Sequence, residues 1–434
     1  MRSVPAVSVQ EPVDDMLSMR IFSINSYNGG QFHSINFVAR TNYIVPSFFA
    51  CLFSVPALLA LVSLLNAQKP FIFDAHVHMI DRQFYHGGNI GDRVQDGQVD
   101  LPRAREGGVN ALFFSLFVTE EYYPQHYETK QALRLVDLAL RQIKQNHNTI
   151  ELALNGSDID RIVKSGKIAA VLDMEGSIDR GGDPAVLRQF YKVGLRSYQL
   201  SAHNAQNGYA DSCCSPPLWH GLNERGKALI AEMNRLGMVI NVSHASDEAI
   251  SQAIDCSSDP VIATHHGLRE FNNIPRNMPD WLLKKLAAKG GLIGFQIGNE
   301  FHNRKVFDWR TQHAGKPFWD TARVNSSNLS IEQIDRIVAP QFPMLGSNAP
   351  DNLKFTVDDW LKVTDRAIQL VGEDHVILGT DFDGGPTLPL PMRDIRDVPL
   401  IIAAMRRRGY SEERIRKIMG GNLLRVFRQI TGKH

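Results

Sequence analysis

The chain has 434 residues, 43% of them hydrophobic and 21% charged, which excludes a disordered or collagen-like protein. Lysine and arginine together number 47 against 46 acidic residues, so the formal net charge is only +1. This balance gives no overall attraction to nucleic acid, and we expect no nucleic-acid partner. Four cysteines are too few for a disulfide scaffold in a chain of this length.

The amino-terminal part of the sequence falls into two segments. Residues 1–43 are polar, rich in serine and asparagine and without clear periodicity, so no structure is assigned to them. Residues 44–65 then run without a single charge, and we interpret 44–68 as a signal peptide or a membrane anchor. Small residues around Ala67 favour cleavage there, which would export the protein to the periplasm or the extracellular space.

Export would place three of the cysteines in an oxidising compartment. Cys213 and Cys214 are adjacent in the sequence, and Cys256 lies further along the chain. We therefore expect that at most one of the adjacent pair forms a disulfide with Cys256.

From Pro70 onward, short apolar runs alternate with longer helical patterns. We expect eight strands, over 71–78, 110–118, 169–176, 197–204, 238–244, 261–266, 291–298 and 375–384. Amphipathic stretches predict helices over 222–236, 247–255, 279–289 and 356–371, and a closing helix pair over 411–430. Apolar strands separated by helices indicate a parallel sheet buried on both faces, which becomes a (β/α)8 or TIM barrel when closed. A doubly wound open sheet is the alternative, but no glycine-rich phosphate turn follows the first strand.

One domain is predicted over 69–434, with no internal repeat. Within it, residues 300–352 form a long polar insertion with only weak helical patterning, directly after the seventh expected strand. An insertion at that point lies beside the mouth of a barrel, where it would act as a lid or as a contact in a homodimer. The basic run 406–408 lies in a helical pattern and is interpreted as solvated surface.

Most of the expected strands end in histidine or a carboxylate. These residues are His76 and His78, Glu175, His203, His244, His265, and Asp381 with Asp383. In a (β/α)8 barrel the carboxyl ends of all strands meet at one face, where the active site lies. Chance would also scatter such residues over helices and strand starts, so their joint placement favours a site over separate structural roles.

The spacing of these residues suits a pair of metal ions. His76 and His78 are two residues apart on a strand and can face the same side. Glu175 has two carboxylate oxygens with which to bridge two ions, and His244 and His265 would complete the second site. Imidazole ligands with one bridging carboxylate suit catalytic zinc. Two such ions, about 3.5–4 Å apart, would share a hydroxide and polarise a carbonyl or phosphoryl oxygen.

The roles of three further residues stay open on spacing alone. His203 could make a structural hydrogen bond or donate to a developing oxyanion. Arg276 could form a surface ion pair or bind a substrate carboxylate. Asp381 could simply cap the segment that follows it.

Sequence motifs spread over 71–430 carry a family resemblance. They are Glu175-Gly176, Ser201-Ala202-His203-Asn204, the run 236–246 ending in Val242-Ser243-His244-Ala245-Ser246, Pro260 to His265, Arg276-Asn277-Met278-Pro279-Asp280, Gly379-Thr380-Asp381-Phe382-Asp383-Gly384, and Asn422 to Phe427. In this order they resemble the membrane (renal) dipeptidase family of the amidohydrolase superfamily.

The resemblance implies a zinc-dependent dipeptidase that uses a hydroxide bridging two Zn²⁺ ions to cleave small dipeptides. It assigns one zinc to His76, residue 78 and Glu175, and the other to Glu175, His244 and His265. It further implies that His203 contacts the scissile carbonyl, Arg276 holds the carboxylate of the dipeptide, and Asp381 shuttles a proton from the bridging water to the leaving amine.

This chain departs from the family pattern at two places. The family usually has His-x-Asp at the first strand, whereas here His76-Val77-His78 stands, and the insertion over 300–352 could reshape the mouth. A second hypothesis is therefore a related amidohydrolase acting on another small amide, such as an N-acyl amino acid or a β-lactam. A third is a secreted or tethered binding protein that has lost catalysis, against which the intact ligand set argues.

Overall fold

The computed structural model describes residues 20–28, 31–39, 70–315 and 326–432, in two units divided after Gln68. In the first unit β1 (Arg20–Asn28) pairs antiparallel with β2 (Gln31–Ala39), from Arg20 opposite Ala39 to Asn28 opposite Gln31. The sequence analysis assigns no structure to residues 1–43, and this hairpin lies within that segment. Ladder hydrogen bonds join backbone groups, so a hairpin can form without a strong hydrophobic alternation.

The expected signal peptide or anchor at 44–68 lies outside the described residues. Among the residues that are described, no helix is both long and apolar enough to cross a bilayer.

The second unit, Lys69–His434, contains a barrel of parallel strands. In sheet order the strands are β3 (Phe73–Val77), β4 (Ala111–Phe117), β6 (Ile168–Glu175), β7 (Leu195–Gln199), β8 (Val239–Asn241), β9 (Ile262–His266), β10 (Leu292–Phe295) and β11 (Val376–Leu378). The barrel closes where Val77 bridges Phe382 and the His78 N–H donates to the Phe382 carbonyl at 2.9 Å. This closure confirms the (β/α)8 barrel and excludes the open doubly wound sheet.

A ninth strand, β5 (Ile150–Leu152), was missed. It pairs with β6 from Ile150 opposite Ile168, beside the first half of β6, while β7 pairs with the second half. Three residues are too few to show a strand periodicity in the sequence.

The side chains inside the barrel change from apolar to polar along the strands. On β6 the side chains of Ala169 and Val171 belong to an apolar cluster that also contains Phe73, Phe113 and Phe427. Further along the same face follow Asp173 and Glu175, both buried. Because alternate residues of a strand share a face, one end of the barrel interior is an apolar core and the other presents polar groups.

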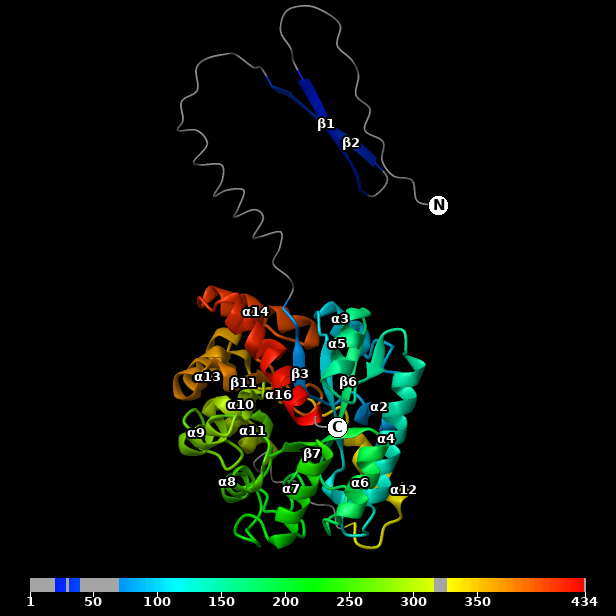
Figure 1. Cartoon of the computed structure of the whole chain (residues 1–434), viewed down its shortest axis with the longest axis vertical. Coiled ribbons are helices and arrows are strands. Elements are labelled where there is room, and N and C mark those ends of the chain that lie inside the picture. Colours follow the sequence, from blue (N-terminus) through cyan, green and yellow to red (C-terminus); the bar gives the residue numbers. More distant parts are fainter. Residues whose placement is uncertain (1–19, 29–30, 40–69, 316–325, 433–434) are drawn as a thin grey trace, which may run out of the picture. The chain divides into compact units, whose positions relative to one another are not determined.

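Helices surround the strands (Figure 1). They are α2 (Asp81–His86), α3 (Leu101–Glu106), α4 (Glu128–Gln145), α5 (Gly156–Lys164), α6 (Pro184–Lys192), α7 (Glu224–Leu236), α8 (Asp247–Cys256), α9 (Asp280–Ala288), α13 (Val357–Val371) and α14 (Val398–Arg407). The closing pair is α15 (Glu412–Arg416) and α16 (Asn422–Thr431), joined by Lys417–Gly421. All expected helices are present, with ends displaced by a residue or two. For α7 the start is fixed by Asn223, whose side chain accepts from the N–H of Gly226.

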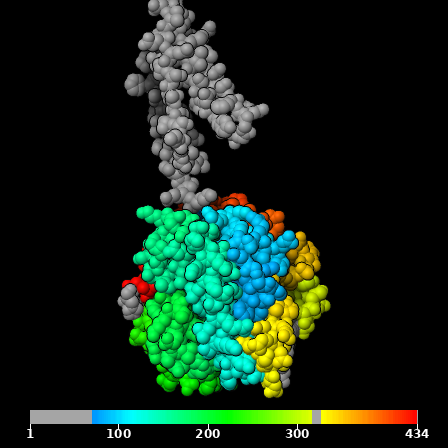
Figure 2. Space-filling view, turned by 90° about the vertical axis from the view of Figure 1, so that its right-hand side faces the viewer, coloured from blue at the N-terminus to red at the C-terminus, as the bar shows by residue number. Residues whose placement is uncertain are grey.

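The insertion is more helical than its sequence pattern indicated. It contains α10 (Asn299–His302), α11 (Arg304–Ala314), α12 (Ile331–Val338) and a short turn at Ala339–Gln341 (η2), with 316–325 outside the described residues. Figure 2 shows its yellow segment lying alongside the blue and cyan segments of the barrel domain. Asp335 explains this contact, because it accepts hydrogen bonds from Tyr122 at 2.6 Å and from Arg134 at 2.6 Å.

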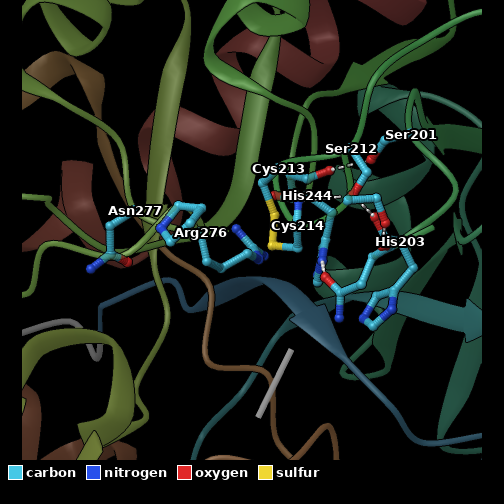
Figure 3. The surroundings of a disulfide bond; sticks show 12 residues. Ser201, His203, Ser212, Cys213, Cys214, His244, Arg276 and Asn277 are labelled. Carbon is cyan, nitrogen blue, oxygen red and sulfur yellow. Dashed lines mark hydrogen bonds between the residues drawn. A yellow bond between two sulfur atoms is a disulfide. The ribbon is translucent and has the colours of Figure 1, made fainter. Parts of the chain in front are cut away.

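Neither of the two adjacent cysteines pairs with Cys256. Cys213 and Cys214 form a disulfide with each other (Figure 3). Cys256 is a free, exposed cysteine at the end of α8. The adjacent pair lies in the loop that follows β7, where the Cys213 N–H donates to the His244 carbonyl at 2.8 Å. This bond holds the loop against the barrel, whereas the Cys256 side chain faces solvent.

Candidate metal centre

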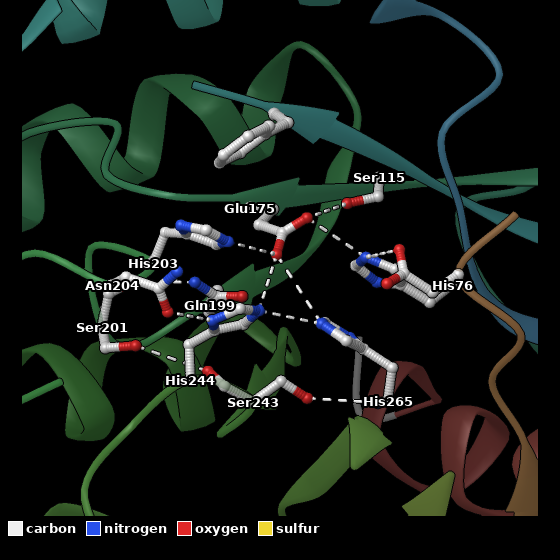
Figure 4. A network of polar contacts seen from close by, with 12 residues as sticks. His76, Ser115, Glu175, Gln199, Ser201, His203, Asn204, Ser243, His244 and His265 are labelled. Carbon is white, nitrogen blue, oxygen red and sulfur yellow. Dashed lines mark hydrogen bonds and ion pairs between the residues drawn. The ribbon is translucent and has the colours of Figure 1, made fainter. Parts of the chain in front are cut away.

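The structure brings the predicted metal ligands together at the carboxyl end of the barrel (Figure 4). His76 lies in β3, Glu175 ends β6 and His265 lies in β9. His78 directly follows β3, and His244 lies in the loop after β8. All five side chains are buried.

Glu175 lies between two pairs of imidazoles. Its Oε2 is 3.2 Å from His76 Nε2 and 3.1 Å from His78 Nε2. Its Oε1 is 3.0 Å from His244 Nε2 and 3.7 Å from His265 Nε2. One carboxylate oxygen therefore faces each pair, which is the arrangement that a bridging ligand of two ions needs.

Outer hydrogen bonds fix which nitrogen of each imidazole faces the centre. His78 Nδ1 lies 3.1 Å from Asp81 Oδ2, and His244 Nδ1 lies 3.0 Å from Asn204 Oδ1. Since both partner oxygens accept, each Nδ1 carries the proton and each Nε2 presents a lone pair to the centre. Such partners orient imidazoles for metal binding and raise their basicity.

The donor set fits cations because two lone pairs face each other. His244 Nε2 and His265 Nε2 are only 3.0 Å apart. His265 Nδ1 lies 3.0 Å from Thr264 Oγ1, which itself donates to Asn241, so this Nδ1 is also the protonated nitrogen. Without a shared cation these Nε2 atoms would repel each other.

The surroundings shift the pKa values of the imidazoles in opposite directions. Burial lowers the pKa of His244 and His265 well below the ordinary value, and the cations nearby, Arg276 foremost for His244, lower it further. Burial also opposes protonation of His76, but the carboxylates of Glu175, Asp173 and Asp381 together outweigh it and raise the pKa of His76 to about 9. The pKa of Glu175 is held well below its usual range, since these imidazoles overcome the effect of burial.

Asp381 completes a second possible group of ligands. Its Oδ1 is 3.1 Å from His78 Nε2 and 3.7 Å from His76 Nε2, and Gln296 donates to its Oδ2 at 2.9 Å. The carboxylate is thus placed either to bind an ion or to accept a proton beside it.

Three of the predicted site residues lie in loops and not at strand ends. His203, His244 and Asp381 have φ values of 57°, 65° and 64°, in the left-handed region that non-glycine residues rarely adopt. The strands before them end earlier than expected, at Gln199, Asn241 and Leu378. Such strained conformations concentrate at functional sites, where they aim a side chain that a regular strand would point elsewhere.

A cavity of about 300 Å³ opens above these ligands. Arg276 lines it and is only 1% exposed, with Nη2 donating to the His265 carbonyl at 2.8 Å. Its Nε and Nη1 have no hydrogen-bond partner among the described residues. A larger hollow of about 610 Å³ lies between α5 and α16, but it contains none of the clustered histidines.

Sequence reasoning missed the residues that hold the site in place. Glu120 Oε1 lies 2.7 Å from His203 Nδ1, and Glu120 and Glu121 both line the cavity. They follow β4 in a short turn, Glu120–Tyr122 (η1), as a Glu-Glu pair that could have been noticed directly after an apolar strand. Asp383, by contrast, binds the Gln98 N–H, and burial raises its pKa to about 7, so its place is structural.

Comparison with known proteins agrees with this geometry. The family model described as "Membrane dipeptidase (Peptidase family M19)" matches residues 64–433. The chain is 31% identical over 367 residues to "Dipeptidase tcpJ" of Claviceps purpurea, covering 82% of this chain and 75% of that protein. It is 28% identical to "Dipeptidase verJ" of Clonostachys rogersoniana, covering 77% and 76%.

Solved structures share the fold. A probable dipeptidase PvdM from Pseudomonas aeruginosa superposes with a TM-score of 0.70 at 22% identity, covering 87% of this chain and 100% of that one. A metallopeptidase from Rhodobacter sphaeroides bound to a phosphinate mimic of L-Ala-D-Ala gives 0.64 at 22% identity, covering 83% and 99%. Fold and site together define a metal-dependent peptidase built on a (β/α)8 barrel. The chain belongs to the membrane dipeptidase family, peptidase family M19, and is a dipeptidase acting on small peptide substrates.

Proposed function

We propose that this protein is a binuclear zinc dipeptidase, with His76, His78 and Glu175 holding one ion and Glu175, His244 and His265 the other. The observation that carries the proposal is the position of Glu175, whose two oxygens each face a different pair of imidazole nitrogens. Nitrogen-rich ligation with one bridging carboxylate suits zinc better than magnesium or calcium, which prefer oxygen ligands.

When bound, the two ions would supply an activated water and polarise the scissile carbonyl. The chain's own residues then arrange the substrate. Arg276 would bind the terminal carboxylate through Nε and Nη1, which have no hydrogen-bond partner in the described parts of the chain. His203 gives its Nδ1 proton to the hydrogen bond with Glu120, and with a second proton on Nε2 it would donate from Nε2 to the carbonyl oxygen as negative charge develops there.

Asp381 would move the proton. Its Oδ1 lies beside the imidazoles of His76 and His78, and its Oδ2 is held by Gln296. From this position the carboxylate would accept a proton from the attacking water and deliver it to the leaving amine.

A second candidate is a related enzyme for another small amide, such as an N-acyl amino acid or a β-lactam. The favouring observation is that Gln341, Met344 and Leu345 of the insertion line the cavity and so contribute to its shape. An N-acyl amino acid would still offer a carboxylate to Arg276, whereas a substrate without one should be insensitive to its loss.

The test is hydrolysis of L-Xaa-L-Xaa and L-Xaa-D-Xaa dipeptides, N-acyl amino acids and a β-lactam by purified protein whose metal content is quantified. Close to two zinc ions per chain, loss of dipeptide hydrolysis on chelation and recovery on zinc addition are expected. Fewer than one zinc per chain, or activity unaffected by chelation, would refute the binuclear zinc proposal.

We also propose export directed by the uncharged segment at 44–65, with Ala67 near the cleavage point or the segment kept as an anchor. Amino-terminal sequencing of the mature protein and its partition between soluble and membrane fractions distinguish cleavage from anchoring. Homodimer formation stays a prediction, which light scattering would check.

A further inference from the structure

The wall of the cavity carries a buried carboxylate that the proposed mechanism does not use. Glu121 is 7% exposed and lines the cavity. Its Oε1 accepts from Gln341 Nε2 at 3.4 Å, a long hydrogen bond, and its Oε2 has no hydrogen-bond partner within the described parts of the chain. No lysine or arginine of the described residues forms an ion pair with it. Burying a carboxylate without a partner cation costs free energy unless a bound ligand pairs with its charge.

Glu121 and Arg276 lie on opposite sides of the barrel mouth. Glu121 follows β4, and Arg276 follows β9. In the strand order β11-β10-β9-β8-β7-β6-β4-β3, with β3 closing onto the segment after β11, these two strands are four steps apart in either direction. The metal ligands on β3, β6 and β9 lie around the same mouth, so the cavity has an acidic wall and a basic wall with the ligand cluster among them.

We infer that Glu121 binds the free α-ammonium group of the substrate, so that the cavity recognises a zwitterion by both of its ends. A dipeptide carries an ammonium group and a carboxylate on either side of one amide bond. With the carboxylate at Arg276 and the amide at the ligand cluster, the ammonium group falls toward the opposite wall. The inference rests on the proposed function, because it takes Arg276 as the carboxylate site.

Recognition by Glu121 would select substrates by their amino terminus. One charge-assisted hydrogen bond to a buried carboxylate changes binding by roughly 10- to 100-fold. The site should therefore prefer an unblocked dipeptide over an N-acyl amino acid by a factor of this size. Gln341 belongs to the insertion, so the insertion positions the carboxylate that makes this choice.

The experiment compares E121Q with the wild type on L-Ala-L-Ala and on N-propionyl-L-alanine, which differs only in lacking the ammonium group. We expect kcat/KM of E121Q to fall by about 10- to 100-fold for L-Ala-L-Ala, mainly through KM, and by less than about 3-fold for N-propionyl-L-alanine. An equal fall for both substrates, or no fall for either, would overturn the inference.

The matched control is E128Q. Glu128 of α4 is 3% exposed and also has an Oε2 without a partner among the described residues, but it does not line the cavity. Both variants should change stability to a similar degree, and only E121Q should change the ratio between the two substrates. If E128Q shifts the ratio equally, the effect is structural and the inference fails.

Binding of a phosphinate dipeptide mimic and of its desamino counterpart, measured by calorimetry, separates this inference from the proposed function. Wild type should bind the amino form about 10- to 100-fold more tightly, and E121Q should lose that preference. This pattern without turnover of any dipeptide would refute the proposed function and leave the Glu121 assignment standing. Equal affinity of the wild type for both mimics would overturn the assignment even in an active dipeptidase.

Discussion

Replacing Arg276 by methionine should have opposite effects on activity and on stability. The guanidinium is buried, donates to the His265 carbonyl through Nη2, and leaves Nε and Nη1 without partners in the described part of the chain. Burial also lowers the pKa of Arg276 to about 10, which shows that its charge is costly in the substrate-free protein. Methionine fills similar space without a charge or a donor, so this cost disappears in Arg276→Met.

The burial of Arg276 sets the size of the expected changes in stability and in kcat/KM. Lowering the pKa of Arg276 from its ordinary value to about 10 corresponds to about 3 kcal/mol of unfavourable burial. The free energy of unfolding should therefore rise by about 1–3 kcal/mol in Arg276→Met, once repacking is allowed for. Against a substrate carboxylate, loss of the paired hydrogen bonds should cost about 3–4 kcal/mol, or roughly 100- to 1,000-fold in kcat/KM.

The assay compares a dipeptide with its carboxyl-terminal amide, together with urea unfolding. Arg276→Met should lose activity on the dipeptide, change little on the amide, and unfold at higher urea concentration. The control is Arg196→Met, because Arg196 is 8% exposed but has its guanidinium bonded to the Leu154, Tyr191 and Leu195 carbonyls outside the cavity. This control should destabilise the protein and leave the ratio of the two substrates unchanged. Equal losses on dipeptide and amide in Arg276→Met would refute the reasoning.

Three further predictions concern other parts of the barrel. Asp81→Asn should weaken zinc retention by about 10-fold in a chelator competition, because Asp81 orients His78 through Nδ1; unchanged retention contradicts this role. Burial lowers the pKa of His302 to about 4, so the unfolded chain binds more protons and the free energy of unfolding falls as pH drops from 6.5 toward 4. His302→Gln should remove about 2 kcal/mol of this loss at pH 5, measured by urea unfolding at several pH values. A pH profile parallel to that of the wild type would contradict this prediction. Serine at both Cys213 and Cys214 should lower the free energy of unfolding by about 1 kcal/mol, while Cys256→Ser, the control, should not.

The parts of the site that the sequence could predict are those encoded in one strand. Glu175 was expected at the end of an apolar run, and β6 ends there. The prediction succeeds here because the short, largely apolar run is buried along its whole length, as strands of a parallel barrel are. His76 and His265 were found by the same argument, since each lies inside a buried strand.

Other features depend on contacts between distant segments, which local patterns do not encode. His203 lies four residues beyond the end of β7, in a left-handed conformation, and its Nδ1 is held by Glu120 from another strand's loop. The pattern extended β7 to 204 because the chain stays apolar and buried through Leu200 and Ala202 after its ladder ends. The pairing of Cys213 with Cys214 escaped prediction for a related reason, because it depends on the loop conformation against His244.

The histidine at position 78 shows how an outer residue can offset a change of ligand. An aspartate there, as in the usual pattern of the family that this sequence resembles, would place one more negative charge at the centre. His78 is neutral as a ligand, but its Nδ1 lies 3.1 Å from the buried Asp81 carboxylate. Hydrogen bonds with Asp381, then with Asp81 and Glu175, raise the pKa of His78 against the effect of burial. The imidazole thereby gains anionic character, and the negative charge moves one side chain outward from the centre. The His-x-His form of the site therefore depends on Asp81 in a way that a His-x-Asp form would not, so the two positions should be exchanged together in any attempt to convert one form into the other.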